Sequence, residues 1–335
     1  MKSIPVPMPP EEIPTEAQLM STWKGDQDKP LVTVLCTTYN HEPFIRNALH
    51  GFLIQRTTFP FRVVVHDDAS TDQTAEIVRE YERRFPRIIR GIYQPTNLYS
   101  RKIDLSSYVD PLIEGEFVAL CEGDDYWTDF RKLEDQARYL LTNPDCSLVC
   151  QPHINAKLEF GGLVAKGGGR ETFLTLTRMY RHDIGLEYPA ELHNLPNGDR
   201  GTLVHLWTRG RIVHLSHLKP AVRVIHPGGV MSMKPKREQL HRQFETWDRI
   251  YHYYKNTQYS HPARLSVLRA RRNLRYLDYT EEYRVSKKFV NGLLYFGARF
   301  RVDWSKFAGR IMGNEIDFNE VLVGNRSSRN DAGIG

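Results

Sequence analysis

Residues 117–127 read Phe-Val-Ala-Leu-Cys-Glu-Gly-Asp-Asp-Tyr-Trp, an apolar run that stops abruptly in three carboxylates. The apolar half predicts a buried strand, and open α/β sheets bind ligands at the carboxyl ends of their strands. Glu122, Asp124 and Asp125 would repel one another as unpaired anions, and Mg2+ or Mn2+ bridging to a phosphate would relieve that repulsion. The alternative is a simple turn in which Asp125 caps a helix beginning near Thr128.

Strand-like and helix-like segments alternate along the chain around this motif. Short apolar runs bounded by turn residues predict strands, and apolar residues at helical spacing predict the connecting helices. The predicted strands include Leu31–Cys36, Phe61–Val65, Ile88–Tyr93 and Ser147–His153, and the predicted helices include 44–53, 72–85, 105–113 and Leu133–Leu141. We therefore expect an α/β fold with a mostly parallel central sheet flanked by helices.

The two ends of the chain differ from this central part, which spans 31–232. Residues 1–30 contain six prolines and little apolar periodicity, which predicts an extended arm. Residues 233–325 are basic, aromatic and helical in pattern and predict a C-terminal helical subdomain, followed by a disordered tail at 326–335.

Within the C-terminal part, an apolar stripe at helical spacing runs through 293–311 with basic residues beside it. Its apolar members are Leu293, Phe296, Phe300, Trp304, Phe307 and Ile311. A basic amphipathic helix with Trp and Phe can lie in a membrane interface. Packing on its own domain is the commoner arrangement, and Asp303 at the edge of the stripe favours it.

Bulk composition places the protein in a broad class. The net charge of +6 among 335 residues is a mild bias toward anionic partners, and on charge alone nucleotides, anionic lipids and nucleic acid are all compatible. The four cysteines lack zinc-site spacing, so reduced structural thiols are expected. Because the sequence shows neither an N-terminal apolar signal region nor a long apolar run, we expect a cytoplasmic protein, with peripheral contact at the inner face of the membrane as an option.

Polar residues gather where three predicted strands end: Thr38-Tyr39-Asn40, Asp67-Asp68 and the acidic motif at 122–125. The first strand is followed by neither a dinucleotide-binding glycine motif nor a P-loop, so a metal ion is the natural way to hold phosphate. Asp68 can accept a hydrogen bond from an N–H of a base, and Tyr39 offers a ring for stacking. Ordinary turn chemistry is the alternative for each residue taken alone.

Three ordered segments then carry a family resemblance: 32–40 (Val-Thr-Val-Leu-Cys-Thr-Thr-Tyr-Asn), 63–72 (Val-Val-Val-His-Asp-Asp-Ala-Ser-Thr-Asp) and 119–127. Together with Lys132-Leu133, they resemble the family 2 inverting glycosyltransferases of the bacterial polysaccharide-building type. The resemblance covers roughly 31–232. It implies the GT-A nucleotide-diphospho-sugar transferase fold, with that segment as the catalytic domain.

By this resemblance, the base of the donor nucleotide would contact Thr38, Tyr39 and Asp68. Asp124 would lie on the ribose and metal side of the donor, and Asp125 would bind the metal. The sequence departs from the family at two loop positions. Thr37 stands where proline is usual, and Ala69 stands where glycine is usual. These departures concern loop geometry and leave the acidic residues in place.

Two further residues complete the expected site. An inverting transfer needs a general base, and Asp199 lies in a segment that resembles the family's base-bearing one; a helix N-cap is its alternative role, and Glu191 is the reserve base. His226 opens a His-Pro-Gly-Gly sequence like the family's closing motif. It is expected to bind the metal or to donate to the diphosphate, with a structural role as the alternative.

The resulting functional hypothesis is a metal-dependent inverting glycosyltransferase that uses Mn2+ or Mg2+ in surface polysaccharide or glycan assembly. Its expected partners are a nucleotide-diphospho-sugar, with a UDP-sugar favoured, and a glycan or lipid-linked glycan acceptor, not nucleic acid. One alternative is a catalytically silent transferase-like sugar-binding or scaffold module. A nucleotidyltransferase ranks lower, because the loop at 37–42 contains neither glycine nor lysine.

Overall fold

The computed structural model describes residues 6–159, 162–167, 173–229, 232–259, 261 and 263–274. The predicted amphipathic stripe at 293–311 and the predicted tail at 326–335 lie outside the described residues. The chain forms two compact units, the first from Met1–Tyr188 and Thr202–Pro227, the second from Pro189–Gly201 and Gly228–Gly335. The second unit therefore takes in a short internal segment, 189–201, that the sequence pattern assigns to the main domain.

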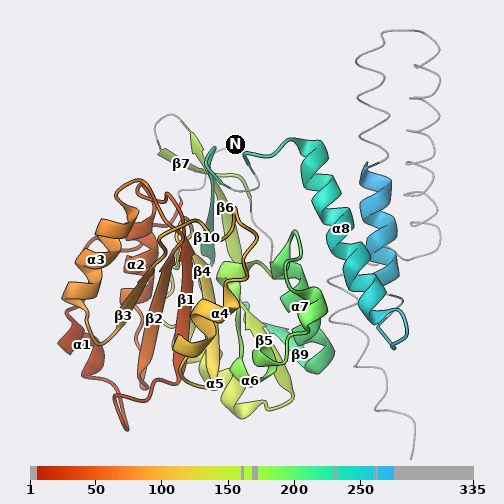
Figure 1. Cartoon of the computed structure of the whole chain (residues 1–335). Helices are drawn as coiled ribbons and strands as arrows, with labels where there is room; N and C mark the ends of the chain where they lie inside the picture. Colours follow the sequence, from red (N-terminus) through yellow and green to blue (C-terminus); the bar gives the residue numbers. More distant parts are fainter. Residues whose placement is uncertain are drawn as a thin grey trace, which may run out of the picture. The chain divides into compact units, whose positions relative to one another are not determined.

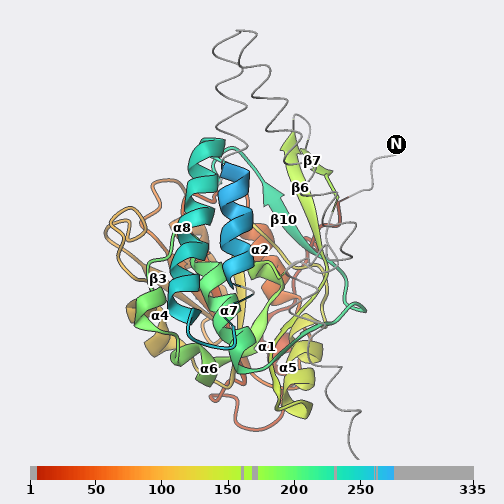
Figure 2. The same cartoon turned by 90° about the vertical axis from the view of Figure 1, so that its right-hand side faces the viewer.

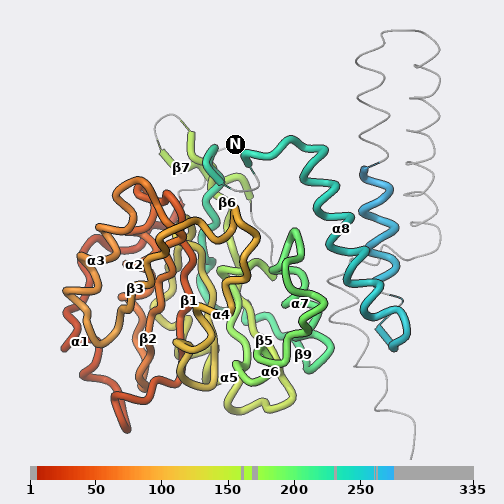
Figure 3. Tube along the Cα trace, viewed as in Figure 1, coloured from red at the N-terminus to blue at the C-terminus, as the bar shows by residue number. Residues whose placement is uncertain are grey.

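A seven-stranded sheet is the centre of the first unit (Figures 1 and 3). Its strands, in spatial order, are β3 (Ile89–Tyr93), β2 (Phe61–Asp67), β1 (Val32–Thr38), β4 (Phe117–Glu122), β8 (Met179–Arg181), β5 (Cys146–Cys150) and β9 (Arg211–His214). The strands from β3 to β4 are parallel, and β8 runs antiparallel to both of its neighbours. The predicted α/β class with a mostly parallel sheet is thus confirmed, and β8, only three residues long, was missed.

A second sheet of three strands has the order β10 (Ala221–Ile225), β6 (His153–Glu159), β7 (Gly162–Ala165). Figure 2 shows these strands side by side. The single strand predicted at Ser147–His153 is wrong, because the chain leaves β5 at Gln151-Pro152 and enters β6 in the other sheet. Proline has no N–H to give to a ladder, which explains the break at this point.

The helices connect and cover the strands. They are α1 (Glu16–Met20), α2 (Ile45–Leu53), α3 (Thr74–Arg84), α4 (Ser106–Val109), α5 (Lys132–Thr142), α6 (His182–Leu186), α7 (Gly198–Arg209) and α8 (Lys236–Tyr254), with short 3-10 turns η1 (Asp110–Leu112), η2 (Thr175–Thr177) and η3 (Ala190–Leu192). The helix predicted over 105–113 is divided into α4 and η1, because Pro111 cannot donate the next helical hydrogen bond. None of the helices in the described ranges combines the length and hydropathy that a bilayer-spanning segment requires.

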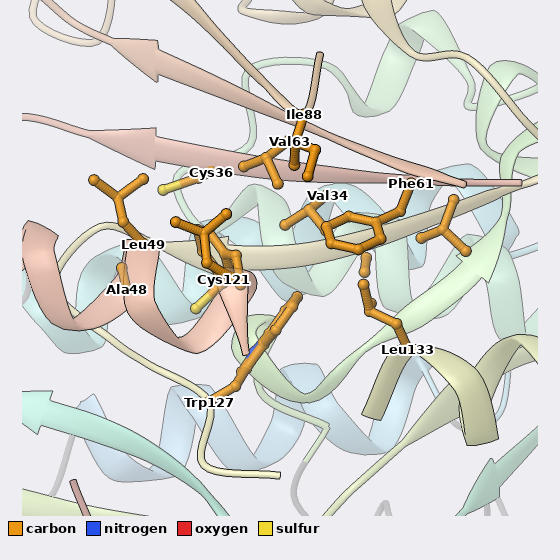
Figure 4. Packing of buried hydrophobic residues seen from close by; sticks show 14 of the residues in the cluster. Val34, Cys36, Ala48, Leu49, Phe61, Val63, Ile88, Cys121, Trp127 and Leu133 are labelled. Atoms are coloured by element: carbon orange, nitrogen blue, oxygen red, sulfur yellow. The ribbon is translucent and has the colours of Figure 1, made fainter. Parts of the chain in front are cut away.

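The core of the first unit lies between the large sheet and its helices. Ala48 and Leu49 of α2 point toward Cys36 and Cys121 of the sheet, and Trp127 fills the space beside them (Figure 4). Because Trp127 directly follows the acidic motif, its burial anchors that motif to the core. The indole N–H also donates to the carbonyl oxygen of Leu176 at 2.8 Å.

A lysine is buried in this same core. Lys132 is fully buried, and its Nζ donates to Gln136 Oε1 at 2.8 Å and to the Thr177 carbonyl oxygen at 3.2 Å. It also lies 4.6 Å from the centre of the Trp127 ring. Burial without a carboxylate partner lowers the pKa of Lys132 to about 7. The amine therefore links α5, η2 and Trp127 largely as a neutral hydrogen-bonding group above that pH.

We predict that Lys132 makes the free energy of unfolding depend on pH, and that Lys132→Met removes this dependence. The unfolded chain keeps the lysine proton up to its ordinary pKa of 10.5, whereas the folded chain releases it near 7, so the unfolded state binds more protons between these values. The free energy of unfolding should therefore rise with pH for the wild type relative to Lys132→Met, by up to about 1.4 kcal/mol per pH unit.

Urea unfolding of both proteins at pH 7.0, 7.75 and 8.5 would measure this difference. Methionine keeps most of the side-chain volume, and subtracting the variant removes the contribution of the buried cysteines. An unchanging difference across the three pH values would contradict the depressed pKa.

Candidate metal and donor site

The ends of three parallel strands bring the predicted polar residues together. In the register of the sheet, Thr38 at the end of β1 pairs with Asp67 of β2, and Thr37 pairs with Glu122 at the end of β4. All three strands therefore end at one edge of the sheet, and the loops that follow them leave from that edge. This is the arrangement expected from the alternating sequence pattern.

A cluster of three possible metal ligands lies at this edge. It consists of His41, Asp124 and His226, whose ligand atoms all lie within 4.8 Å of one another. The Asp124 Oδ2 is 3.0 Å from Nε2 of His226 and 3.8 Å from Nε2 of His41. These residues come from the loop after β1, the loop after β4 and the end of β10, so the cluster joins the two sheets of the first unit.

The His41 ring is held in an orientation suited to metal binding. Its Nδ1 lies 3.1 Å from the hydroxyl of Thr38, and burial lowers the pKa of His41 despite the nearby carboxylate of Asp124. A neutral imidazole whose Nδ1–H donates to the Thr38 hydroxyl leaves the Nε2 lone pair directed at the cluster. Thr38 is buried and its hydroxyl contacts His41; its contact with the base of the donor stays a prediction.

A glycine allows the acidic loop to approach Thr38 this closely. A Cβ at Gly123 would lie 2.6 Å from Thr38 Oγ1 and 2.7 Å from its Cβ. Any larger side chain at this position would push the loop away from the end of β1. The glycine of the Glu-Gly-Asp-Asp motif therefore serves the close packing that brings Asp124 to His41.

The two adjacent aspartates have opposite environments. Burial opposes ionisation of Asp124, but the hydrogen bond from His226 and the charge of the nearby imidazoles lower its pKa overall. Asp125 is more deeply buried than Asp124, and burial together with the neighbouring charges of Asp124 and Glu122 raises the pKa of Asp125. The Oδ1 atom of Asp125 accepts the backbone N–H of Val224 in β10 at 2.8 Å.

The cluster thus contains the carboxylate of Asp124, whereas the family resemblance assigns the metal to Asp125. Asp124 and His226 are brought together as expected from the sequence, and direct metal binding by Asp125 stays a prediction. His41 was missed at the level of sequence. The available signal was its position directly after Thr38-Tyr39-Asn40, in a loop already identified at the end of a strand.

On the donor side, Asp68 holds the loop that follows β3. Its two carboxylate oxygens accept the backbone N–H groups of Leu98 at 2.6 Å and Tyr99 at 3.1 Å. Tyr39 is 41% exposed, so its side chain is accessible for stacking. Base recognition by Asp68 and Tyr39 stays a prediction, and Asp68 has in addition a structural role in fixing the 97–99 loop.

Asp199, the expected base, belongs to the second unit and lies in the first turn of α7. Helix α8 of the same unit holds the chain that precedes it. The Arg249 guanidinium donates to the carbonyl oxygens of Asn194 at 3.0 Å and His193 at 2.9 Å, and Asn197 donates its N–H to the hydroxyl of Thr246 at 3.1 Å. The role of Asp199 as the base stays a prediction.

The donor set of the cluster fits a divalent cation. Two imidazole nitrogens and one ionised carboxylate oxygen can converge on a single ion with small adjustments of their side chains. Mg2+ strongly prefers oxygen ligands and retains several waters, whereas imidazole nitrogen suits transition metals. On chemistry alone, the residues therefore suit Mn2+ better than Mg2+.

Comparison with known proteins gives a consistent result. Residues 33–189 match the glycosyl transferase family 2 profile. An uncharacterized protein of Mycobacterium tuberculosis is 43% identical over 123 residues, 36% of this chain and 34% of the relative. The Bacillus subtilis protein TuaG, named as a putative teichuronic acid biosynthesis glycosyltransferase, is 30% identical over 122 residues, 36% of this chain and 44% of the relative. The chain thus spans less than half the length of these relatives.

Solved structures resemble the chain in fold. Staphylococcus aureus TarS in complex with UDP-GlcNAc has a TM-score of 0.56 at 20% identity, over 80% of this chain and 79% of TarS. The mannosyltransferase PcManGT of Pyrobaculum calidifontis, in complex with GDP-Man and Mn2+, has a TM-score of 0.50 at 16% identity, over 82% and 81% of the two chains. At these identities the likeness concerns the fold alone.

The site loop also contains a strained residue that predicts a stabilising substitution. Ala69, directly after Asp68, has φ +63, a left-handed backbone that costs an L-residue about 1–2 kcal/mol. Ala69→Gly removes this strain at an entropic cost of about 0.4–1 kcal/mol, so the free energy of unfolding should rise by up to about 1 kcal/mol.

Ala48→Gly is the matched control, because Ala48 is buried in the middle of α2. This substitution should lower the free energy of unfolding by about 1 kcal/mol or more. Thermal and urea unfolding would compare the two variants. Equal destabilisation by both substitutions would contradict the strain at Ala69.

Proposed function

The chain belongs to glycosyl transferase family 2 through residues 33–189 and has the GT-A fold, and from this premise we propose that it is a metal-dependent inverting glycosyltransferase. The proposed reaction moves a sugar from a nucleotide-diphospho-sugar to an acceptor hydroxyl. The observation that carries the proposal is the cluster of His41, Asp124 and His226 at the carboxyl edge of the sheet. It offers a cation site where donors bind in α/β folds.

The proposed donor is a nucleotide-sugar, with a UDP-sugar favoured. TarS with UDP-GlcNAc and PcManGT with GDP-Man and Mn2+ support this class of donor through their shared fold. In this chain, the exposed ring of Tyr39 and the loop held by Asp68 provide a surface for the base beside the cation cluster. The name of TuaG supports an acceptor among surface polysaccharides, such as a glycan or a lipid-linked glycan.

In the proposed mechanism, His41, Asp124 and His226 would hold the cation, preferably Mn2+. When bound, the cation supplies a Lewis acid that stabilises the negative charge on the departing nucleoside diphosphate. Thr38 keeps the His41 ring in place, and Asp125 fixes the acidic loop to β10 through the N–H of Val224. These residues therefore preorganise the leaving-group side of the site.

On the acceptor side, we propose that Asp199 takes the proton from the attacking hydroxyl. The oxygen of the acceptor forms a bond to the anomeric carbon as the bond to the diphosphate breaks, so the product has the opposite anomeric configuration. The sequence of the base segment supports this assignment, and α8 gives the segment a fixed backbone through Arg249.

The central prediction compares the two adjacent aspartates. Asp124→Asn should weaken Mn2+ binding by more than about 100-fold and abolish metal-dependent turnover of a UDP-sugar. Replacing even a residue that only hydrogen-bonds to a metal ligand lowers metal affinity by about 10–100-fold, and the loss of a ligand itself should be larger. Asp125→Asn keeps an oxygen that accepts the N–H of Val224, so Mn2+ binding should weaken by less than about 10-fold. Calorimetric Mn2+ titration and donor hydrolysis assays would measure both effects.

If Asp125→Asn is the variant that loses Mn2+, the metal assignment made from the sequence is right and Asp124 is not the main ligand. Full turnover of the wild type in EDTA with a panel of UDP-, GDP- and dTDP-sugars would contradict metal dependence altogether. Donor binding without any turnover would instead support a silent sugar-binding module.

A second prediction tests the base. Asp199→Asn should lower kcat for transfer by about 10²–10⁴-fold, the usual contribution of general-base assistance, with little change in donor affinity. Glu191→Gln is the control, because its segment is held by the same helix and it is the next carboxylate considered for this role. Transfer at the wild-type rate by Asp199→Asn, or a product of retained configuration, would contradict the assignment.

A further inference from the structure

The N-terminal arm packs against the residues that carry the cation cluster. Residues 6–10 form neither helix nor strand, Pro9 is buried, and Val6 packs on a small apolar cluster in the first unit. That cluster consists of Phe44, Tyr126, Ala156, Val222 and Val224. We call residues 6–10 the N-terminal strap.

Tyr126 connects the strap to the acidic loop. Its hydroxyl donates to the carbonyl oxygen of Pro7 at 3.1 Å, and the sulfur of Met8 lies 3.1 Å from the same hydroxyl. The backbone of Tyr126 forms two hydrogen bonds with Val222 of β10, at 3.1 and 2.9 Å. Tyr126 directly follows Asp125 and therefore belongs to the acidic loop. The strap holds this loop through the side chain of Tyr126, and β10 holds it through the backbone of Tyr126.

From this apolar cluster, two short connections lead to the cation ligands. Two residues beyond Val222, Val224 donates to Asp125, and two residues further His226 contacts Asp124. Phe44, a member of the apolar cluster, packs its ring against His226 with 4.4 Å between ring centres. The strap therefore packs on the residues that support His226, namely Phe44, Tyr126 and the strand β10.

A second anchor fixes the other end of the strap. The carbonyl oxygen of Pro10 lies 3.1 Å from Nδ1 of His50, and Nε2 of His50 lies 2.7 Å from the hydroxyl of Tyr81. A carbonyl can only accept, so Nδ1 carries the proton and, in the neutral ring, Nε2 accepts from Tyr81. Burial lowers the pKa of His50, which favours this neutral form.

We propose that the N-terminal strap is a positioning element of the cation site, with Val6 and Tyr126 as its positioning residues. The strap limits the movement of Phe44, Tyr126 and β10, and so keeps His226 and Asp124 at binding distance. The proposal rests on the proposed function only for the identity of the ligand, a divalent cation.

The composition of the strap suits this role. Its prolines, Pro7, Pro9 and Pro10, restrict the backbone in the unfolded chain, so that ordering the strap costs less conformational entropy than for other residues. Proline also lacks an N–H, and the strap accordingly uses carbonyl acceptors and apolar contacts in place of strand pairing. A flexible arm with the same length would hold the cluster less firmly.

The test uses full-length variants. Tyr126→Phe removes the hydroxyl that contacts Pro7, and Val6→Ser weakens the apolar contact at the start of the strap. Tyr93→Phe is the matched control, because it removes a phenolic hydrogen bond to Glu82 (2.9 Å) elsewhere in the same unit. Mn2+ affinity would be measured by calorimetry without donor, and backbone hydrogen exchange of 222–226 in the metal-free protein.

We expect Tyr126→Phe and Val6→Ser each to weaken Mn2+ binding by about 3- to 10-fold, the usual effect of one net hydrogen bond or small apolar contact, and to accelerate exchange in 222–226. Tyr93→Phe should lower the melting temperature and leave both measurements unchanged. Wild-type affinity and exchange in both strap variants would overturn the proposal.

Failure of the proposed function gives a different result. A wild-type protein that binds no Mn2+ would contradict metal dependence, and the exchange of 222–226 would then decide by itself whether the strap orders this segment. Wild-type Mn2+ binding that Asp124→Asn abolishes and the strap variants do not alter would leave the proposed function intact and overturn the strap alone.

Discussion

Two neighbouring carboxylates at the end of β4, Asp124 partly buried and Asp125 buried, are the feature on which the site depends. Two like charges this close cannot both be stabilised by the same environment. In this protein the two side chains have different neighbours. Asp124 lies among imidazoles, which lower its pKa, while Asp125 accepts a backbone N–H from β10 and has a raised pKa. One aspartate thereby contributes an ionised carboxylate to the candidate metal cluster, and the other holds the loop that presents it. Strand β10 serves both, because it supplies the N–H of Val224 and then His226.

Much of this arrangement follows directly from the order of residues along the chain. Parallel strands that alternate with helices end at one edge of a sheet, so the convergence of residues after β1, β2 and β4 could be predicted from local patterns alone. His226 could be included because it opens a His-Pro-Gly-Gly sequence that resembles the closing motif of a known family. The α/β class followed from periodicity, whereas the assignment to the GT-A fold and the expected roles of single residues came from the resemblance to a known family.

The remaining features depend on long-range contacts that local patterns do not encode. Which of two adjacent aspartates faces the cluster is decided by the pairing of Tyr126 with Val222, almost a hundred residues later in the chain. His41 reaches the cluster because Asn40 takes a left-handed backbone with φ 52, secured by its contacts with Ser70 and Thr71 of the neighbouring loop. Likewise, the apolar run at 147–153 looks continuous, although its two halves enter different sheets.

In both units, a loop near the expected site residues is held by a side chain that hydrogen-bonds to backbone groups of the loop. This kind of contact affects which residues of the loop can be substituted. Asp68 fixes its loop by accepting two backbone N–H groups, and Arg249 fixes the segment before Asp199 by donating to backbone carbonyl oxygens. Backbone groups are the same at every residue other than proline, so side chains in these loops can change without loss of the loop position. A fixed backbone with variable side chains therefore lets the surface of a loop change while the scaffold stays the same, and the fold itself is shared with solved structures at only 16–20% identity.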